Sequence, residues 1–454
     1  MRNAVYGYIL KRAIKALRPK STISDVRTAL SYQQLFERAE GLARTLTHHK
    51  YGILCESQLN AAIALLACFA ANKTAVPMSS RYGEAHARGI IAAARLSYAI
   101  TDSGIAQIAD TRPEAEDLSD IPLIMHTSGT TGSPKGAMIS NGNLIANLED
   151  IAAYFDIGSS DRILVARPLY HCAVLTGEYL AALAAGAAIH FYDGEFQPAG
   201  MIQTMRNHGI SALGGTPTLF YHLCRTAERH GQPLPLRVAV ASGECMDAAV
   251  AKLMRRSMPE TRIYNVYGLT EASPRVSWLD PARFDERPTS VGVPLRSVEV
   301  KTEGGELLVR GPNVMRGYYG NHEETERALR DGWLHTGDMA ELANDGCISI
   351  LGRRDDMIIR AGVNIYPSEI ESVLRYCEGI NDVMAYGIKR SRKVGQGIGL
   401  KIVSGMSKNE VFELCKAKLP RYQLPDSIEI VDVIPRNASG KAIRKEDGND
   451  AKRA

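Results

Sequence analysis

The chain has 454 residues and a formal net charge of +4; 45% of its residues are hydrophobic and 23% are charged. This composition is typical of a globular protein that is large enough for two or more domains. So small a net charge gives no support for a nucleic-acid partner, and eight scattered cysteines without a CxxC pair favour reduced thiols in a cytoplasmic protein over disulfides or zinc.

The first twenty residues are basic, with no acidic residue before Asp25. They predict an ordinary amphipathic helix rather than a transit peptide. The apolar stretches at 61–71 and 179–189 are too short to cross a bilayer, so no membrane span is expected.

The stretch TSGTTGSPKG (127–136) lies between an apolar run and a helix-like segment that begins at Asn143. Its hydroxyls, backbone N–H groups and single cation suit a polyphosphate. It is not an ordinary P-loop, because GxxxxGK[ST] would require glycine at Pro134 and Ser or Thr at Gly136. A flexible linker, the alternative, would not explain the threonines, a proline and a lysine between a strand and a helix.

The middle of the chain alternates strands with helices, which predicts a parallel sheet covered on both faces. Ligands bind beyond the carboxyl ends of the strands of such sheets, and polar and glycine residues gather there in 168–171, 214–217, 242–245 and 267–271. The predicted strands are 162–170, 187–193, 210–215, 236–242 and 261–268, and the predicted helices are 177–185, 198–208, a segment ending near Arg229, and 247–257.

The pattern changes after about residue 290, where short alternating strands with glycine turns indicate an antiparallel or barrel-like piece. The charged stretch 352–357 is expected to be a domain boundary. Beyond it, about a hundred residues have their own α+β pattern, with predicted helices at 367–376 and 408–419 and strands at 382–389 and 427–434.

The stretch 127–136 resembles the phosphate loop of the adenylate-forming superfamily, which includes acyl- and aryl-CoA synthetases, peptide-synthetase adenylation domains and beetle luciferase. The resemblance extends over 30–446, because further motifs follow in the family's order. These are PLYH (168–171), ASGE (241–244), NVYGLTEAS (265–273), GELLVRGPNVMRGYYG (305–320), GWLHTGDMA (332–340), GRRDDMIIRAGVNIYPSEIE (352–371) and PRNASGKAIRKE (435–446).

The resemblance implies an α/β fold with a large N-terminal domain (1–353), built from parallel α/β sheets and a small barrel-like β piece. A hinge (354–357), with Asp355 as the hinge residue, would connect it to a small mobile α+β domain (358–454) that carries the catalytic lysine.

The resemblance also implies ATP and Mg²⁺ as cofactors. Tyr267 would stack on adenine, Thr270 would reach the α-phosphate, and Asp338 would bind the ribose with support from Arg353. Glu271 would hold Mg²⁺ together with Thr131. The remaining residues assigned to the nucleotide are Thr127, Ser128, Gly129, Thr130, Gly132 and Lys135 in the phosphate loop, and Gly243, Glu244, Cys245, Asn265 and Gly268 around the base.

Lys441 is the main catalytic candidate, together with Thr270, Glu271 and His171. In the family this lysine bridges the carboxylate and the α-phosphate during adenylation, a task that suits a compact and flexible ammonium group. Each assignment has a simpler alternative. Glu271 would suit the first turn of a helix, Asp338 a turn after glycine, and His171 an ordinary wall position.

The residues expected to line the acid pocket are small or apolar, and no acid follows 168–171 until Glu178. Relatives that activate amino acids have an aspartate there, so the sequence favours an uncharged acyl or aryl acid. The pocket candidates are His171, Cys172, Gly214, Gly215 and Thr216.

The expected function is that of an acid:thiol ligase, which forms acyl-AMP, releases pyrophosphate and transfers the acyl group to coenzyme A. One alternative is a stand-alone enzyme that loads the phosphopantetheine of an acyl or peptidyl carrier protein. Another is a binding module without catalysis, against which the joint presence of Lys135, Glu271, Asp338, Arg353 and Lys441 argues.

Overall fold

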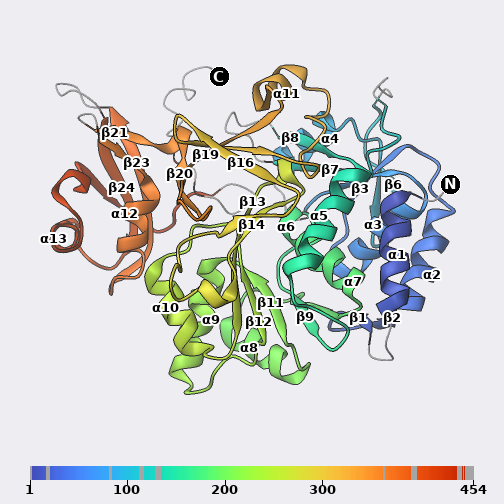
Figure 1. Ribbon diagram of the computed structural model, residues 1–454, viewed down its shortest axis with the longest axis horizontal. Coiled ribbons are helices and arrows are strands. Elements are labelled where there is room, and N and C mark those ends of the chain that lie inside the picture. Colours follow the sequence, from blue (N-terminus) through green and yellow to red (C-terminus); the bar gives the residue numbers. More distant parts are fainter. Residues whose placement is uncertain are drawn as a thin grey trace. The chain divides into compact units, whose positions relative to one another are not determined.

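The computed structural model describes residues 3–16, 21–80, 84–111, 117–127, 134–360, 363–389, 396–436, 442 and 444. The chain forms two compact units. Unit 1 comprises Met1–Lys301, Leu308–Thr336 and Leu342–Ser349, and unit 2 comprises Thr302–Leu307, Gly337–Glu341 and Ile350–Ala454. The elements are labelled in Figure 1.

A nine-stranded sheet forms the middle of unit 1, in the order β15-β14-β13-β12-β11-β9-β10-β1-β2. The five predicted strands are confirmed, and each pairs in parallel with its neighbours among them. These strands are β9 (Arg162–Val165), β10 (Ala188–Phe191), β11 (Ala212–Gly215), β12 (Val238–Ala241) and β13 (Arg262–Gly268); the outer strands are β1 (Thr22–Ser24), β2 (Ala29–Ser31), β14 (Arg275–Trp278) and β15 (Val293–Pro294).

The predicted crossover helices are also present, and α8, α9 and α10 have recognisable starts. Thr216 and Asp247 accept hydrogen bonds from the first turns of α9 and α10, and prolines occupy the first turns of α8 and α9. The helices are α6 (Cys172–Val174), α7 (Ala181–Ala185), α8 (Pro198–Asn207), α9 (Pro217–Arg229) and α10 (Ala248–Ser257). Between α6 and α7 the segment Leu175–Leu180 is π-helical, a form often found at functional sites.

A second sheet of unit 1 has six strands in the order β6-β5-β3-β4-β7-β8. The expected first helix, α1 (Ala4–Ala16), is confirmed; its buried face packs against α3, α5 and α7. The strands are β3 (Lys50–Ile53), β4 (Thr74–Pro77), β5 (Tyr98–Thr101), β6 (Gly104–Gln107), β7 (Leu123–Thr127) and β8 (Lys135–Ile139), with helices α2 (Tyr32–Ala43), α3 (Gln58–Ala70), α4 (Glu84–Ala93) and α5 (Asn141–Tyr154).

The predicted barrel-like piece is a five-stranded sheet in the order β16-β17-β19-β18, with β20 also paired to β19. No pairing among its described strands closes it into a barrel. Its elements are β16 (Glu299–Glu303), β17 (Glu306–Arg310), α11 (His322–Ala328), β18 (Leu329–Arg330), β19 (Trp333–Leu342) and β20 (Ile348–Arg353).

Unit 2 has its own apolar core under a three-stranded sheet. The helices and strands predicted beyond residue 357 are confirmed; β24, which pairs with both of its neighbours, was not predicted. The elements are β21 (Ile358–Arg360), β22 (Val363–Ile365), α12 (Pro367–Leu374), β23 (Ile380–Lys389), β24 (Gln396–Ser404), α13 (Lys408–Lys418) and β25 (Ser427–Ile430).

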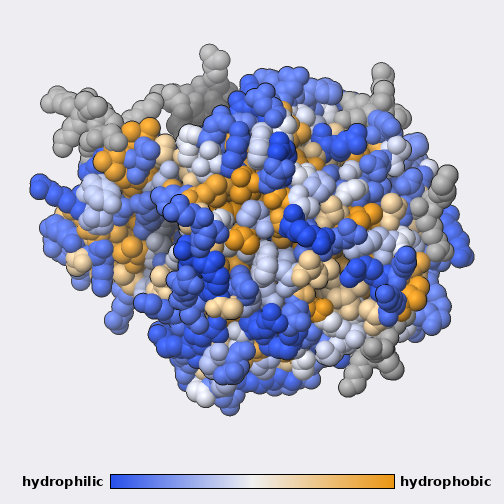
Figure 2. Space-filling view, viewed as in Figure 1, coloured by the Kyte–Doolittle hydropathy of each residue, from blue (hydrophilic) through white to orange (hydrophobic). Residues whose placement is uncertain are grey.

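Figure 2 shows hydrophobic and hydrophilic residues mixed over the visible face. None of the helices in the described ranges combines the length and the apolar character needed to cross a membrane. All eight cysteines lie in described positions and are free thiols, as the sequence predicted.

Candidate active site

The carboxyl ends of β9, β11, β12 and β13 lie along one edge of the nine-stranded sheet, because these strands are parallel neighbours. The four polar segments that follow them therefore meet at that edge, as the sequence predicted. The structure thus brings together His171 and Cys172, the glycines 214 and 215, Thr216, the segment 243–245, and the segment 267–271.

The phosphate loop connects β7 to β8, and Thr127 lies opposite Lys135 in that antiparallel pair. The Lys135 ammonium forms an ion pair with Glu324 and holds the pKa of that carboxyl below its usual value. Lys135 and Glu324 are both largely buried. The remaining loop residues assigned to phosphate and Mg²⁺ binding, Ser128, Gly129, Thr130, Thr131 and Gly132, lie outside the described residues.

Tyr318 links Lys135 to Glu271. Its hydroxyl donates a hydrogen bond to Glu271 Oε1 at 2.8 Å, and Lys135 Nζ lies 5.7 Å from the centre of its ring. The segment around it is fixed on both sides, because Met315 N–H donates to the Glu271 carbonyl and Tyr319 N–H to the Gly136 carbonyl, each at 2.8 Å. Sequence reasoning missed Tyr318, although it belongs to the quoted motif GYYG.

Several residues assigned to the nucleotide lie on β13 or in the turn directly after it. Tyr267 and Gly268 end β13, and a side chain at Gly268 would collide with the Pro274 carbonyl oxygen. Thr270 follows in a single 3₁₀ turn, Thr270–Ala272, that also contains Glu271. Asn265 is buried and donates to the Ser290 carbonyl at 2.8 Å, so its amide already fixes the loop beside the strand.

The segment after β12 turns sharply at Gly243, whose φ of 88° favours glycine. Glu244 accepts hydrogen bonds from the backbone N–H and the hydroxyl of Thr218, at 3.2 and 2.7 Å. It therefore caps the N-terminus of α9. Cys245 beside it is exposed.

A buried ion pair, absent from the sequence-based prediction, lies at the same sheet edge. Arg167, directly after β9, donates to Glu178 Oε1 at 2.6 Å and to Ser242 Oγ at 3.3 Å. Glu178 belongs to the π-helical segment, and its side chain is only 2% exposed. The sheet edge, where the sequence predicted small or apolar pocket residues, therefore also carries a charged pair. Its signal in the sequence is an arginine directly after an apolar strand.

His171 and Cys172 begin the helical segment that leads to Glu178. The His171 ring packs against Tyr170, with ring centres 4.5 Å apart. Burial raises the pKa of the Cys172 thiol to about 12, so this cysteine stays protonated and is not a nucleophile. The other buried arginine of this region, Arg275, lies against Gly177 on a different wall.

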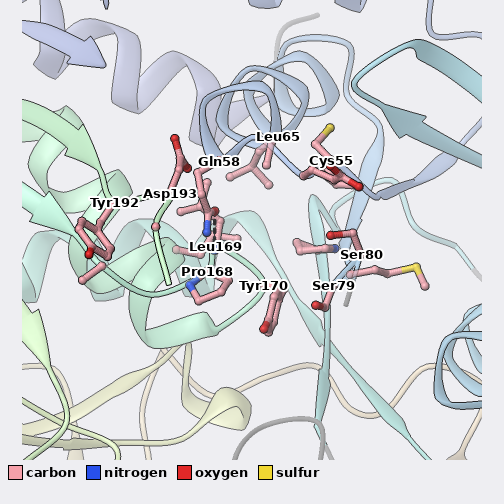
Figure 3. A pocket seen from close by; sticks show the side chains of 18 of the residues that line it. Cys55, Gln58, Leu65, Ser79, Ser80, Pro168, Leu169, Tyr170, Tyr192 and Asp193 are labelled. Carbon is pink, nitrogen blue, oxygen red and sulfur yellow. Dashed lines mark hydrogen bonds between the residues drawn. The ribbon is translucent and has the colours of Figure 1, made fainter. Parts of the chain in front are cut away.

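A cavity of about 240 Å³ is lined in part by Ala166, Pro168, Leu169 and Tyr170 (Figure 3). Residues after β3 and β4 and along α3 line one side, and residues after β9 and β10 the other. Gln58 Oε1 accepts from the Leu169 backbone N–H at 3.1 Å across it. Burial raises the pKa of Asp193, which lines the cavity, to about 6.

In unit 2, Arg353 donates to Asp338 Oδ1 at 3.0 Å, so the two residues assigned to the ribose are paired. The backbone N–H of Gly337 donates to Glu306 Oε1 at 2.8 Å, and Arg354 donates to Glu306 Oε2 at 2.7 Å. Glu306 thus fixes the turn before Asp338. Asp355 lies in the 3₁₀ turn Arg354–Asp356.

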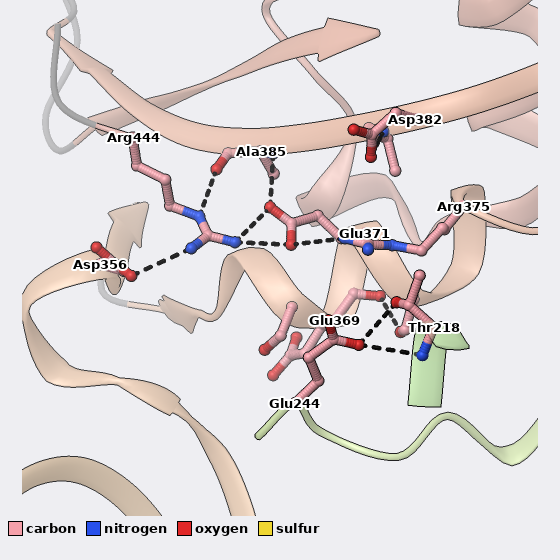
Figure 4. A network of polar contacts seen from close by, with 12 residues as sticks. Thr218, Glu244, Asp356, Glu369, Glu371, Arg375, Asp382, Ala385 and Arg444 are labelled. Carbon is pink, nitrogen blue, oxygen red and sulfur yellow. Dashed lines mark hydrogen bonds and ion pairs between the residues drawn. The ribbon is translucent and has the colours of Figure 1, made fainter. Parts of the chain in front are cut away.

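Lys441 lies outside the described residues; Arg444, three residues further along the sequence, is attached to unit 2 (Figure 4). Arg444 donates to both oxygens of Glu371 at 2.7 Å and pairs with Asp356 at 3.3 Å. Glu371 also accepts from the backbone N–H of Ala385 at 2.9 Å. Arg444 is therefore attached to α12 and β23.

Two family models match the chain. The model of the AMP-binding enzyme covers residues 10–118 and 101–319, and that of the AMP-binding enzyme C-terminal domain covers residues 369–441. A feruloyl-CoA synthase of Amycolatopsis sp. is 30% identical over 98% of this chain and 99% of its own length. A long-chain-fatty-acid–CoA ligase of Salmonella typhimurium is 31% identical over 75% of this chain and 63% of its own length.

Among solved structures, the o-succinylbenzoate CoA synthetase MenE from Bacillus subtilis, in complex with its acyl-adenylate intermediate, has a TM-score of 0.84 at 25% identity. The match covers 100% of this chain and 98% of MenE. The chain belongs to the family of AMP-binding enzymes. Within that family its class is the AMP-forming acyl-CoA synthetases, as the sequence motifs predicted.

Proposed function

We propose that this chain activates an uncharged acyl or aryl acid with ATP, releases pyrophosphate, and transfers the acyl group from acyl-AMP to coenzyme A. The observation that carries the proposal is the connection of Lys135 and Glu271 through Tyr318. A cation for polyphosphate and a carboxylate for a divalent ion are thereby fixed in one part of the fold. Such fixed charges suit phosphoryl-group chemistry, which depends on positioning and electrostatic stabilisation.

The residues present fit a magnesium ion that is bound mainly by the phosphate oxygens of the substrate, with one carboxylate from the protein. Glu271 gives one oxygen to Tyr318, and the described residues make no hydrogen bond to Oε2. No group of three or more His, Cys, Asp or Glu side chains within the described ranges forms a protein-only metal site. Mg²⁺ commonly takes one or two carboxylates, waters and phosphate oxygens, and when bound it neutralises charge on the phosphates.

Lys135 would neutralise the departing pyrophosphate. Its present partner is Glu324, so a phosphate group would replace that carboxylate as the counter-charge. Asp338 would accept hydrogen bonds from the ribose hydroxyls, with Arg353 holding the carboxylate in place. Lys441 would bridge the acid and the α-phosphate during the first half-reaction.

The acceptor is proposed to be coenzyme A because the relatives named above are CoA synthases and ligases. A carrier-protein phosphopantetheine has the same thiol, so the test must include both acceptors. Tyr267 and the segment 243–245 are proposed to hold the adenine base.

The test is acid-dependent exchange of labelled pyrophosphate into ATP over fatty, aryl and amino acids, in parallel with Lys441→Ala. We expect exchange with fatty or aryl acids, its loss in the variant, and thioester formation with coenzyme A. Exchange with amino acids only would contradict the proposed substrate class. Acyl transfer only to a carrier protein would contradict coenzyme A as the acceptor. No exchange from folded protein that binds ATP would refute the ligase activity.

A further inference from the structure

The Arg167–Glu178 pair is an unusual feature for a pocket that is otherwise made of glycine, threonine and apolar residues. Glu178 has only 2% of its side chain exposed and Arg167 has 16%, and their nitrogen and oxygen atoms lie 2.6 Å apart. Glu178 Oε2 and Arg167 Nε are buried and have no hydrogen-bond partner among the described residues. Among the described residues, the pair therefore leaves part of its hydrogen-bonding capacity unsatisfied.

The fold makes room for this pair at a specific position. A Cβ on Gly214 would lie only 2.5 Å from the Glu178 carboxyl carbon, so any side chain there would displace the carboxylate. The buried carboxylate in turn keeps the guanidinium at the sheet edge instead of letting it extend into solvent. Glu178 is thus a positioning residue for Arg167.

The guanidinium lies beside Ser242 and Gly243, at the sheet edge where the segments assigned to the acid and to the nucleotide meet. A Cβ on Gly243 would lie 3.8 Å from Arg167 Nη1 and equally far from Thr216 Cγ2. Gly243 and Thr216 were assigned to the nucleotide and to the acid, respectively. Arg167 therefore presents an N–H donor at the edge where the acyl group is proposed to bind.

The charge of the pair limits what this donor can bind. Arg167 is already neutralised by Glu178, and a second carboxylate near a buried Glu178 would be repelled and poorly solvated. A neutral oxygen acceptor would gain a hydrogen bond from a charged donor, which is among the stronger kinds in proteins. A purely hydrocarbon acid would leave that donor without a partner.

We propose that Arg167 is a specificity-determining residue that selects acids whose acyl or aryl part carries a neutral oxygen acceptor, such as an ether or a ketone. This inference rests on the proposed acid-activating function and narrows its substrate class. It extends the sequence prediction, because the acid remains uncharged apart from the reacting carboxylate.

The test uses two series of acids that differ in one group: cinnamate, 4-methoxycinnamate and 4-carboxycinnamate, and hexanoate, 5-oxohexanoate and adipate. Dissociation constants are measured by calorimetry in the presence of AMP. In at least one series we expect the methoxy or oxo acid to bind the wild-type chain about tenfold or more tightly than the plain acid. The dicarboxylate should bind no more tightly than the plain acid.

Variants separate recognition from folding. Arg167→Met combined with Glu178→Gln removes both charges and leaves no buried ion unpaired, so the protein should fold and the preference should fall to about twofold or less. Glu178→Gln alone leaves Arg167 without its counter-ion, so the dicarboxylate should gain about tenfold. The matched control is Arg237→Met with Asp161→Asn, a pair 2.7 Å apart at the opposite ends of the same strands, which should leave the preference unchanged.

Wild-type protein that shows no preference in either series, or binds none of these acids, would overturn the inference, as would a preference that survives in the double variant. Pyrophosphate exchange with no preference would leave the proposed function standing and remove this inference. Preferential binding of the methoxy or oxo acid without pyrophosphate exchange would support this inference and refute the proposed function.

Discussion

Tyr318 is the residue on which the geometry of the proposed phosphate site depends most. One hydroxyl and one ring connect it to Glu271 and Lys135, which lie far apart in the sequence. A carboxylate held by a tyrosine hydroxyl loses rotational freedom before any ligand arrives. The site is therefore organised in advance for a charged ligand.

Tyr318→Phe should keep the ring and remove the hydrogen bond to Glu271. We expect kcat/KM for acid-dependent pyrophosphate exchange to fall about tenfold to a hundredfold, as for loss of a hydrogen bond to a charged group. The fall should be partly recovered at high Mg²⁺. Tyr319→Phe is the matched control, because its hydroxyl contacts Lys50 instead. Equal losses in the two variants would argue against the role of Tyr318.

His126, at the end of β7 beside the phosphate loop, links stability to pH. Burial lowers its pKa from 6.5 to about 4, and both ring nitrogens are buried without hydrogen-bond partners among the described residues. Between these two values the unfolded chain binds a proton that the folded chain does not, so stability is lost as pH falls from 6.5 towards 4.

His126→Leu should therefore reduce the pH dependence of unfolding. The wild-type free energy of unfolding should fall between pH 7.5 and pH 5 by about 2 kcal/mol more than that of the variant. The measurement is urea unfolding at both pH values. His190, whose pKa burial also lowers to about 4, contributes equally in both proteins. Identical pH dependence in the two proteins would contradict the prediction.

At the scale of elements, Arg444, three residues after Lys441 in the sequence, is attached to α12 and β23. Arg444→Lys keeps the charge but loses the two-pronged contact with Glu371. We expect the rate of acyl-AMP formation in a single turnover to fall about tenfold, with ATP and acid affinities nearly unchanged. Arg375→Lys is the control, because Arg375 also pairs with Glu371, at 3.6 Å, but lies at the C-cap of α12. A similar loss in both variants would point to a general defect of unit 2.

The alternation of apolar strands with helices was enough to predict the elements between 162 and 268, because each element of a parallel sheet carries its own periodicity. The strand β24 was missed, and so was the π-helical form of Leu175–Leu180, because hydrogen-bond spacing inside a helix leaves no mark in the apolar pattern.

The site was predicted only where a motif carried it. Tyr318 and the Arg167–Glu178 pair depend on contacts between residues that are at least 11 positions apart in the sequence, which periodicity does not report. The proposed roles of Lys441 and the glycine-rich loop still rest on resemblance alone.

At the scale of the whole molecule, the residues proposed to act on ATP are divided between two compact units. Lys135 and Glu271 belong to unit 1, and Asp338 and Lys441 to unit 2. A hinge at 354–357 remains our proposal for how the units serve two half-reactions in turn.

Arg354→Pro tests that hinge. Arg354 is the first residue of its 3₁₀ turn and follows an extended Arg353, so proline fits the present backbone and restricts its rotation. We expect one half-reaction to slow more than about tenfold and the other less than about threefold. Arg354→Ala also removes the pair with Glu306 but leaves the backbone free, so it should affect the two half-reactions to a similar degree. If the proline variant slows acyl-AMP formation and thioester formation by the same factor relative to wild type, the hinge proposal is contradicted.

The missing side chain at Gly214 also constrains how this protein can change over evolutionary time. A mutation that adds a side chain at 214 is not tolerated while Glu178 remains, and loss of Arg167 first would leave a buried carboxylate without its counter-ion. Only a mutation of Glu178 makes later mutations at Gly214 and Arg167 tolerable. A descendant with a hydrocarbon pocket would therefore have to acquire its mutations in that order, and Glu178 is the position at which a drift in substrate preference would begin.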